Sequence, residues 1–183
     1  MKQLHDLLDD VRALEIRGAN PTITALEYDS RRVERGSCFF AVRGTASDGH
    51  AFIPAAIERG AVAIVCQELP TEINDNIAYV VVEDSNVAMA AMAASFYDHP
   101  TLELKLVGVT GTNGKTTTAT LLYDMFMAMG YKAGLISTVI YRIGERSIAS
   151  THTTPDAIRL NAMMRQMVDE GCDYCFMEVS SHA

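Results

Sequence analysis

A glycine-rich turn between an apolar run and a helix-forming run constrains the fold of this chain more than any other feature. Residues 106–117 read LVGVTGTNGKTT, so a short apolar segment leads into a turn that ends in Gly-Lys-Thr-Thr. Two glycines allow the backbone to curl with its N–H groups pointing inward, and a following helix directs its positive end at the same point. The segment therefore predicts a loop that grips the phosphates of ATP or GTP, set between a buried strand and a helix.

Seven consecutive residues of this loop are the expected nucleotide contacts: Gly111, Thr112, Asn113, Gly114, Lys115, Thr116 and Thr117. Lys115 can reach the β and γ phosphates, and the Thr116 hydroxyl can ligate magnesium. The strict pattern requires glycine six residues before the lysine, where this chain has Val109. A plain strand–turn–helix junction is the alternative, but the strand-and-helix context favours a phosphate loop.

Composition limits the kinds of partner and compartment. The net charge of −8 argues against nucleic acid or anionic membranes as partners, whereas a local nest of N–H groups still attracts a nucleotide. With 49% apolar and 21% charged residues, the chain resembles an ordinary soluble globular protein. No stretch approaches the ~20 apolar residues of a membrane span, and the N-terminus lacks a signal-peptide pattern. We therefore expect a cytoplasmic protein.

The chain divides into two parts near His99-Pro100, because proline disfavours helix at the residue before it. The first part, residues 1–99, mixes short strands with helices. Its expected strands are Thr22–Tyr28, Ser37–Val42, Ala61–Cys66 and Ala78–Val82. Its expected helices are Gln3–Val11, Ala51–Arg59 and Asn86–Tyr97.

In the second part, residues 100–183, strands alternate with helices, which predicts a doubly wound parallel sheet. The expected elements, in order, are Lys105–Val109 (strand), the phosphate loop, Lys115–Met129 (helix), Lys132–Ser137 (strand), a hairpin near Gly144, Pro155–Glu170 (helix) and Tyr174–Val179 (strand). The fold class is thus α/β, with a small mixed α/β domain followed by the start of a phosphate-loop domain. Since such domains contain further strands, we expect a fragment of a longer protein.

Two side-chain patterns have structural interpretations. Apolar residues recur at helical spacing in both helices of the second part, which indicates core packing rather than a metal or cofactor site. These residues are Leu122, Met125, Phe126 and Met129 in one helix and Leu160, Met163, Met164 and Met167 in the other. Cys172 and Cys175 form a C-x-x-C, a spacing that can indicate zinc or redox chemistry. Without a second pair or a histidine set, we interpret them as two unrelated, partly buried thiols.

Polar residues near the end of the chain supply the remaining candidates. Glu178 ends an apolar strand, where phosphate-loop proteins place an acidic ligand for magnesium; a solvated carboxylate is the alternative. His182 follows at the same sheet edge and either helps to hold the metal or a phosphate, or is a polar loop residue. We assign Lys115, Glu178 and His182 to catalysis. In TTPD (153–156), Thr154 as N-cap and Pro155 as first helical residue explain the segment, although a helix start is also an anion site.

Four segments, in order, closely resemble the Mur ligases of bacterial cell-wall synthesis. They are DSRRVERGSCFFAVRG…DGHAFIPAAIERGA, VTGTNGKTT, TTPD and MEVSSHA, and they extend over nearly the whole chain. The family uses the loop variant with valine at position 109. TTPD and EVSSH resemble in particular the branch that adds the third residue of the peptidoglycan stem peptide. Without the resemblance, the polar residues of the first segment read as turns with capping aspartates.

The resemblance implies residue roles in both parts. The uridine and diphosphate of a UDP-sugar would be bound by Tyr28, Ser30, Thr45, Ala46 and Ser47. Contacts with the muramoyl dipeptide would come from His152, Thr153, Thr154 and Ser180, with His152 where the family often has asparagine. Magnesium would be held by Thr116 and Glu178.

The implied activity is ATP-dependent amide formation between UDP-N-acetylmuramoyl-L-alanyl-D-glutamate and a diamino acid. The diamino acid would be meso-diaminopimelate or L-lysine, and we expect the protein to be a monomer. The family also uses a carbamylated lysine and a C-terminal amino-acid-binding domain. Neither lies within these 183 residues, so we expect the chain alone to be inactive. Alternatives are a sister Mur ligase, a folylpolyglutamate synthase and a noncatalytic UDP-sugar-binding module. A GTPase switch would need a guanine-reading Asn-Lys-x-Asp, which does not occur.

Overall fold

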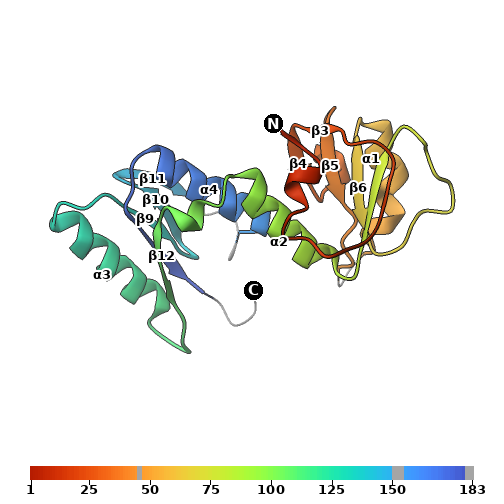
Figure 1. The fold of residues 1–183 in the computed structure, drawn as a ribbon. Helices are drawn as coiled ribbons and strands as arrows, with labels where there is room; N and C mark the ends of the chain where they lie inside the picture. Colours follow the sequence, from red (N-terminus) through yellow and green to blue (C-terminus); the bar gives the residue numbers. More distant parts are fainter. Residues whose placement is uncertain (45–46, 150–154, 180–183) are drawn as a thin grey trace. The chain divides into compact units, whose positions relative to one another are not determined.

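The computed structural model describes residues 1–44, 47–149 and 155–179. The chain forms two compact units, Met1–Phe96 and Tyr97–Ala183. Each unit is built on its own five-stranded sheet with helices packed against it (Figure 1). The α/β class expected from the sequence is therefore confirmed.

The first unit has a sheet of order β2-β7-β6-β5-β4. Its four parallel strands are β4 (Ala25–Glu27), β5 (Ser37–Phe40), β6 (Ala63–Cys66) and β7 (Ala78–Val82). The edge strand β2 (Ala13–Arg17) pairs with β7 in the antiparallel direction, and β1 (Lys2–Gln3) pairs with β3 (Thr22–Ile23) in a separate ribbon. The helical segments are α1 (Ile53–Glu58), α2 (Ser85–Phe96) and the short 3-10 turns His5–Leu7, Ser30–Arg32 and Gly49–Phe52.

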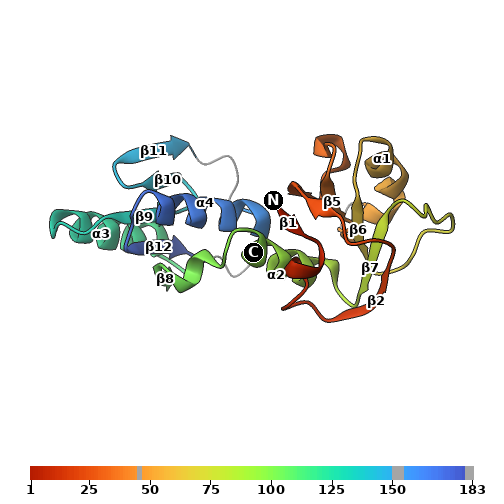
Figure 2. The same ribbon diagram turned by 45° about the horizontal axis from the view of Figure 1, so that its top comes forward.

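The core of this unit follows from the alternation of side chains along its central strands. Phe39, Ile64 and Tyr79, one from each of β5, β6 and β7, pack with Ile53 and Ala56 of α1. Their immediate neighbours in the strands point to the opposite face, because successive side chains of a strand alternate. Those neighbours are also fully buried, and Figure 2 shows α1 and α2 on different sides of this sheet. A sheet buried on both faces explains why these strands read as continuous apolar runs.

The second unit has a sheet of order β11-β10-β9-β12-β8. Its parallel strands are β8 (Lys105–Val109), β12 (Tyr174–Glu178) and β9 (Ala133–Ile136), with β12 in the middle. The hairpin β10 (Ile140–Ile143) and β11 (Arg146–Ala149) extends the sheet in the antiparallel direction. The remaining elements are α3 (Lys115–Ala128), α4 (Ala157–Asp169) and the 3-10 turn Pro100–Leu102.

The two helices of this unit cover different faces of the sheet. Leu135 and Phe176 pack with Ala119 and Tyr123 of α3. The adjacent strand residues Ile136 and Cys175 instead pack with the methionines of α4. Because adjacent strand residues face opposite sides, α3 and α4 lie on opposite faces, which confirms the doubly wound arrangement (Figure 1).

The expected helix Gln3–Val11 is wrong. Lys2 and Gln3 form a strand, and only His5–Leu7 make a single 3-10 turn. Leu4 and Leu7 are fully buried, and the Leu4 N–H donates to the Pro21 carbonyl, so tertiary contacts hold this segment. One turn already buries the two leucines, and the apolar spacing therefore did not require a longer helix.

Two further strand predictions need correction. The expected strand Thr22–Tyr28 is two strands, β3 and β4, which pair with different partners on either side of Thr24. The strand β2 was not predicted, and its residues, ALEIR, are largely exposed. An edge strand with few buried side chains gives a weak apolar signal, so its partner β7 decides where it forms.

The predicted core stripes are confirmed for α4 and partly wrong for α3. Met163, Met164 and Met167 are buried among the residues of the second unit. In α3 the buried positions are Ala119 and Tyr123, whereas Met125 is 48% and Met129 62% exposed. The Tyr123 hydroxyl donates to the Gly144 carbonyl at 2.6 Å, which fixes the helix face that meets the sheet.

The start of α4 differs from the expected one. The N-cap of α4 is Asp156, whose carboxylate accepts from the Arg159 N–H, and the helix begins at Ala157 rather than at Pro155. Thr154 lies outside the described residues.

All four cysteines are free and buried, which confirms the interpretation of Cys172 and Cys175 as separate thiols. Among the described helices, none combines the length and apolar character needed to cross a bilayer.

Candidate functional site

Three parallel strands of the second unit end at the same edge of the sheet. Val109 of β8 is paired with Glu178 of β12, and Ile136 of β9 is paired with Met177. The glycine-rich loop leaves β8 at this edge, and the turn between β9 and β10 lies there too. Ligands of open α/β sheets bind beyond the carboxyl ends of the strands, so this edge is the candidate site.

The loop that follows β8 has the conformation of an anion-binding turn. Gly111 has φ +145° and Gly114 φ +79°, the region that favours glycine. Gly114 is the N-cap of α3, and the Thr118 N–H donates to its carbonyl at 2.8 Å. The N–H groups of the first helical turn have no partner within the helix, so a phosphate can accept from them.

Lys115 folds back over this loop. Its ammonium group donates to the Gly111 carbonyl at 2.8 Å. The side chain therefore crosses the turn formed by residues 111–115. Its positive charge is held at this turn, which leads into the start of α3. An ammonium group held there adds a full positive charge to the helix dipole, which is the electrostatic setting that a polyphosphate requires.

The Glu178 carboxylate gathers hydrogen bonds from two other elements. Its Oε2 accepts from the Thr116 hydroxyl at 2.8 Å, from the Thr138 hydroxyl at 3.1 Å and from the Thr138 N–H at 3.2 Å. Burial raises the pKa of this carboxyl, but these hydrogen bonds and the charge of Lys115 outweigh it, so the net pKa is lowered. Glu178 is therefore an anion at neutral pH, although its side chain is buried.

These residues fit a magnesium ion that arrives with a nucleotide. The Thr116 hydroxyl and the Glu178 carboxylate are hard oxygen ligands and already lie within hydrogen-bond distance. Magnesium is commonly held by one or two carboxylates together with substrate phosphates, rather than by a full cage of protein ligands. The described residues include no group of three or more His, Cys, Asp or Glu side chains that could hold a metal.

The described candidates of the first unit follow neighbouring parallel strands. Tyr28, 43% exposed, and Ser30 come after β4, and Ser47 is exposed after β5. Two aspartates cap the turns that hold them. Asp29 accepts from the Arg31 N–H and guanidinium, which lowers the pKa of its carboxyl to about 2.

The second capping residue is Asp48, whose carboxylate accepts from the N–H of His50 and pairs with its ring. The other ring nitrogen of His50 accepts from the Gln67 N–H at 3.0 Å, so the ring proton lies on Nδ1 and is donated to Asp48. This pair ties the turn after β5 to the end of β6. Capping therefore explains the aspartates, as expected. Of the neighbouring candidates, Tyr28 and Ser47 are exposed and Ser30 is half-buried.

Seven expected site residues lie outside the described residues. They are Thr45, Ala46, His152, Thr153, Thr154, Ser180 and His182. Of the remaining set, Lys115, Thr116 and Glu178 come together in the second unit. Tyr28, Ser30 and Ser47 belong to the first unit.

Sequence reasoning missed Thr138. This residue follows β9, the third parallel strand that ends at the edge, and it donates twice to Glu178. The available signal was its place two residues beyond the apolar strand β9, at the sheet edge where Glu178 ends β12. It was overlooked because a threonine in a strand-to-hairpin turn carries no motif of its own.

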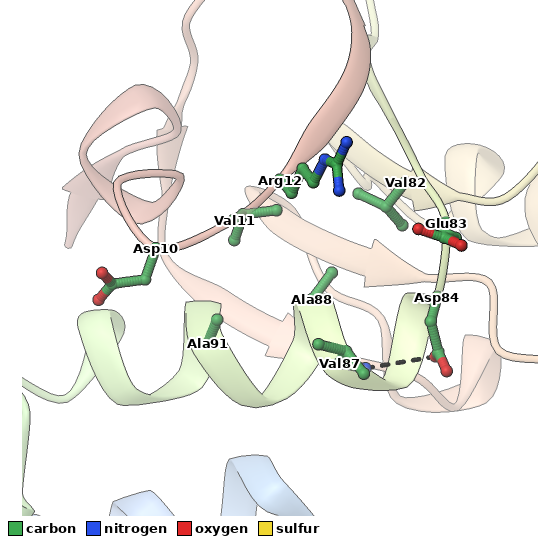
Figure 3. Close-up of a pocket in the computed structure, with 9 residues that line it drawn as sticks. All are labelled: Asp10, Val11, Arg12, Val82, Glu83, Asp84, Val87, Ala88 and Ala91. Atoms are coloured by element: carbon green, nitrogen blue, oxygen red, sulfur yellow. Dashed lines mark hydrogen bonds between the residues drawn. The ribbon is translucent and has the colours of Figure 1, made fainter.

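A cavity of about 460 Å³ lies elsewhere, in the first unit. Its lining comes from the segment before β2, the end of β7 and the first turns of α2, as Figure 3 shows. Its charged residues are Asp10, Arg12, Glu83 and Asp84, and Val87 forms part of its apolar wall. None of the described site candidates lines it. Asp84 is occupied as the cap of α2, accepting from the N–H groups of Asn86 and Val87.

Two family models match the chain. The Mur ligase family catalytic domain matches residues 22–97, and the Mur ligase middle domain matches residues 109–183. The second match begins at the last residue of β8 and includes the phosphate loop, Thr138 and Glu178.

Relatives and solved structures agree with these matches. The chain is 52% identical over 182 residues to UDP-N-acetylmuramoyl-L-alanyl-D-glutamate--2,6-diaminopimelate ligase of Bacteroides fragilis, covering 99% of this chain and 38% of the relative. With the ligase of the same name from Geobacillus thermodenitrificans it shares 53% identity over 167 residues, 91% of this chain and 34% of the relative. The chain thus spans little more than a third of these proteins.

Among solved structures, one with that ligase name has a TM-score of 0.72 and 25% identity, covering 87% of this chain and 32% of the other. A MurF of Acinetobacter baumannii has a TM-score of 0.66 at 19% identity, covering 97% of this chain and 35% of the other, and supports the fold alone.

Proposed function

Because this chain belongs to the Mur ligase family, we propose that it forms the UDP-sugar-binding and nucleotide-binding parts of a longer ATP-dependent ligase of peptidoglycan synthesis. One observation carries the proposal: the hydrogen bond between Thr116 of the phosphate loop and Glu178, beside Lys115. It unites a phosphate-binding turn and an acidic metal ligand at one sheet edge. The names of relatives at about half identity support the ligase class.

The proposed reaction joins the D-glutamyl γ-carboxylate of UDP-N-acetylmuramoyl-L-alanyl-D-glutamate to an amino group of a diamino acid. The carboxylate attacks the γ-phosphorus of ATP, and ADP leaves, giving an acyl phosphate. The amine then attacks the acyl carbon, loses a proton, and inorganic phosphate departs from the tetrahedral intermediate. We assign meso-diaminopimelate as the diamino acid, in line with the relatives' names, with L-lysine as the alternative.

Within this chain, the second unit would hold the ATP. The N–H groups of the loop from Gly111 to Thr117 donate to the phosphate oxygens, and the Lys115 ammonium moves from the Gly111 carbonyl to a β or γ oxygen. Two anions, the substrate carboxylate and the γ-phosphate, can meet only where such positive groups neutralise them. Magnesium, when bound by Thr116 and Glu178, supplies further neutralisation of the phosphate charge.

The first unit would hold the UDP part of the substrate. We assign the uridine and diphosphate contacts to Tyr28, Ser30, Thr45, Ala46 and Ser47, and the contacts to the muramoyl dipeptide to His152, Thr153, Thr154 and Ser180. His182 is proposed as a catalytic residue near the metal. We further propose a cytoplasmic monomer, a compartment that suits four free thiols.

The test is a substrate comparison with the complete ligase that we propose contains this chain. With Mg-ATP and meso-diaminopimelate, UDP-N-acetylmuramoyl-L-alanyl-D-glutamate should yield ADP, phosphate and the UDP-muramoyl tripeptide, read by mass spectrometry. Turnover of the UDP-muramoyl tripeptide instead would identify a sister Mur ligase. Turnover of a folate would identify a folylpolyglutamate synthase, and binding of the UDP-sugar without ADP release a noncatalytic module. Substituting L-lysine decides the amino acid.

A further inference from the structure

The Glu178 carboxylate is held asymmetrically. All three of its hydrogen bonds reach Oε2, and two of the three come from Thr138. Within the described residues, Oε1 accepts none. Among the described residues, the donors thus all meet one oxygen, and the lone pairs of the other have no donor.

Thr138 is itself fixed by a tight turn between β9 and β10. The neighbouring Ser137 is buried, and its hydroxyl donates to the Ile140 carbonyl at 2.8 Å. The same hydroxyl accepts from the Ile140 N–H at 3.1 Å, and the Ser137 N–H also donates to the Ile140 carbonyl. These bonds close the turn around Thr138. Its N–H and hydroxyl therefore face Glu178 with little freedom to reorient.

The Thr116 hydroxyl also has a definite role in this arrangement. Its proton is donated to Glu178, which leaves its oxygen lone pairs free for a cation. A hydroxyl can donate its proton to a carboxylate and ligate a metal at the same time. The hydrogen bond between Thr116 and Glu178 is therefore compatible with a bound ion, provided that the carboxylate stays in this orientation.

We propose that Thr138 is a positioning residue for the metal that accompanies ATP. It holds Oε2 of Glu178 toward the protein, so that Oε1 and the Thr116 oxygen are both available to one divalent ion. This inference rests on the proposed function of the phosphate loop. It assigns to the β9–β10 turn a part in nucleotide binding that does not require contact with the nucleotide.

The test separates metal binding from nucleotide binding. Calorimetry of the complete ligase gives the Kd for ATP at saturating Mg²⁺ and again in EDTA, and the ratio of the two measures how strongly the metal tightens binding. Thr138→Val removes the hydroxyl and keeps the side-chain volume and the backbone N–H. We expect the ratio to fall about tenfold, a typical loss when a group that orients a metal ligand is removed. The Kd in EDTA should stay unchanged.

Two variants serve as matched controls. Thr138→Ser keeps the hydroxyl and should preserve the ratio. Thr120→Val makes the same chemical change at a half-buried threonine of α3 that is not a hydrogen-bond partner of Glu178, and it too should preserve the ratio. Thr138→Ala removes the same hydroxyl by a different substitution and should reproduce the loss seen with valine.

The outcomes distinguish the two proposals. If the unmodified ligase binds no ATP under either condition, the proposed function is wrong and the role of Thr138 falls with it. If the unmodified ligase shows Mg²⁺-dependent tightening that Thr138→Val leaves intact, only the positioning role is wrong. Equal weakening with and without Mg²⁺, or loss of the folded state by circular dichroism in both Thr138→Val and Thr138→Ala, would make Thr138 a structural residue and overturn the inference.

Discussion

The Thr116 hydroxyl donates a 2.8 Å hydrogen bond to Glu178, a residue 62 positions further along the chain. The bond joins the first turn of α3 to the carboxyl end of β12. It exists because β8 and β12 are parallel neighbours whose register pairs Val109 with Glu178. The glycine-rich loop and the Glu178 carboxylate thus meet through sheet pairing rather than through proximity in sequence.

Lys115→Ala should weaken ATP binding by the complete ligase about 10- to 100-fold, because a hydrogen bond to a charged group contributes about 1.5–3 kcal/mol. Calorimetry with Mg-ATP measures the loss. Lys105→Ala is the matched control, since it removes an exposed lysine at the opposite end of β8. Equal effects of the two substitutions would show that general charge, and not the loop, attracts the nucleotide.

Gly114→Ala and Gly130→Ala should distinguish the effect of backbone strain on stability from the effect of the loop conformation on ATP binding. Both glycines have positive φ, +79° and +87°, and neither would bring an added Cβ into close contact. Each substitution should lower the free energy of unfolding by about 1–2 kcal/mol, the cost of a left-handed conformation for alanine. Only Gly114→Ala should also weaken ATP binding. Urea unfolding and calorimetry provide the two measurements, and unaltered affinity in that variant would count against the loop.

Asp29→Asn should reduce stability in a pH-dependent way. The folded-state pKa of Asp29 is lowered to about 2 from its ordinary value of 3.8, chiefly by hydrogen bonding with the Arg31 guanidinium. The stabilisation is therefore present above about pH 4 and is lost as the pH falls through 2. Because Arg31 is exposed, we expect less than about 1 kcal/mol, diminished by salt.

Asparagine at position 29 retains an acceptor for the Arg31 N–H, so the substitution isolates the charge. Urea unfolding of the 183-residue chain from pH 5 to pH 2 should show the two proteins converging in stability. A difference that stays constant over this range would rule out the carboxylate charge as its cause.

Asp156→Ala should cost about 1 kcal/mol of unfolding free energy, because the Asp156 carboxylate caps α4 through the Arg159 N–H at 2.8 Å. Asp156→Asn, which keeps a capping oxygen, should lose only a few tenths of that amount. Thermal unfolding followed by circular dichroism would compare the variants. If alanine and asparagine were equally destabilising, the charge of Asp156, and not its cap, would be responsible.

Local patterns predicted most of the second unit. The strand Lys105–Val109 and the start of the following helix at Lys115 were placed correctly, since an apolar run, two glycines and a lysine follow one another without interruption. The predicted burial of this strand is wrong, because β8 is an edge strand of its sheet and its residues are exposed up to Gly108. The position of Glu178 at the end of an apolar strand was also predicted correctly. In the first unit, the largely buried strand Ala78–Val82 was also placed correctly. Each of these signals lies within a few residues.

The errors arose where long-range contacts outweigh local spacing. The N-terminal leucines suggested a helix, but pairing of Lys2 with Ile23 and the bond from Leu4 to Pro21 hold that segment as a strand and one turn. In α3, Met125 and Met129 kept helical spacing yet stayed exposed, because Tyr123 reaches the hairpin and decides which side of the helix faces the sheet.

By itself, the sequence determined the glycine-rich turn before α3, the acidic end of β12 and the family, because each depends on residues that are adjacent in the chain. Only the tertiary structure decided that Thr138 belongs with them. Its two hydrogen bonds to Glu178 span 40 residues and depend on β9 and β12 lying side by side. Strand neighbours and register are set by the packing of the whole sheet against α3 and α4, which no short segment encodes.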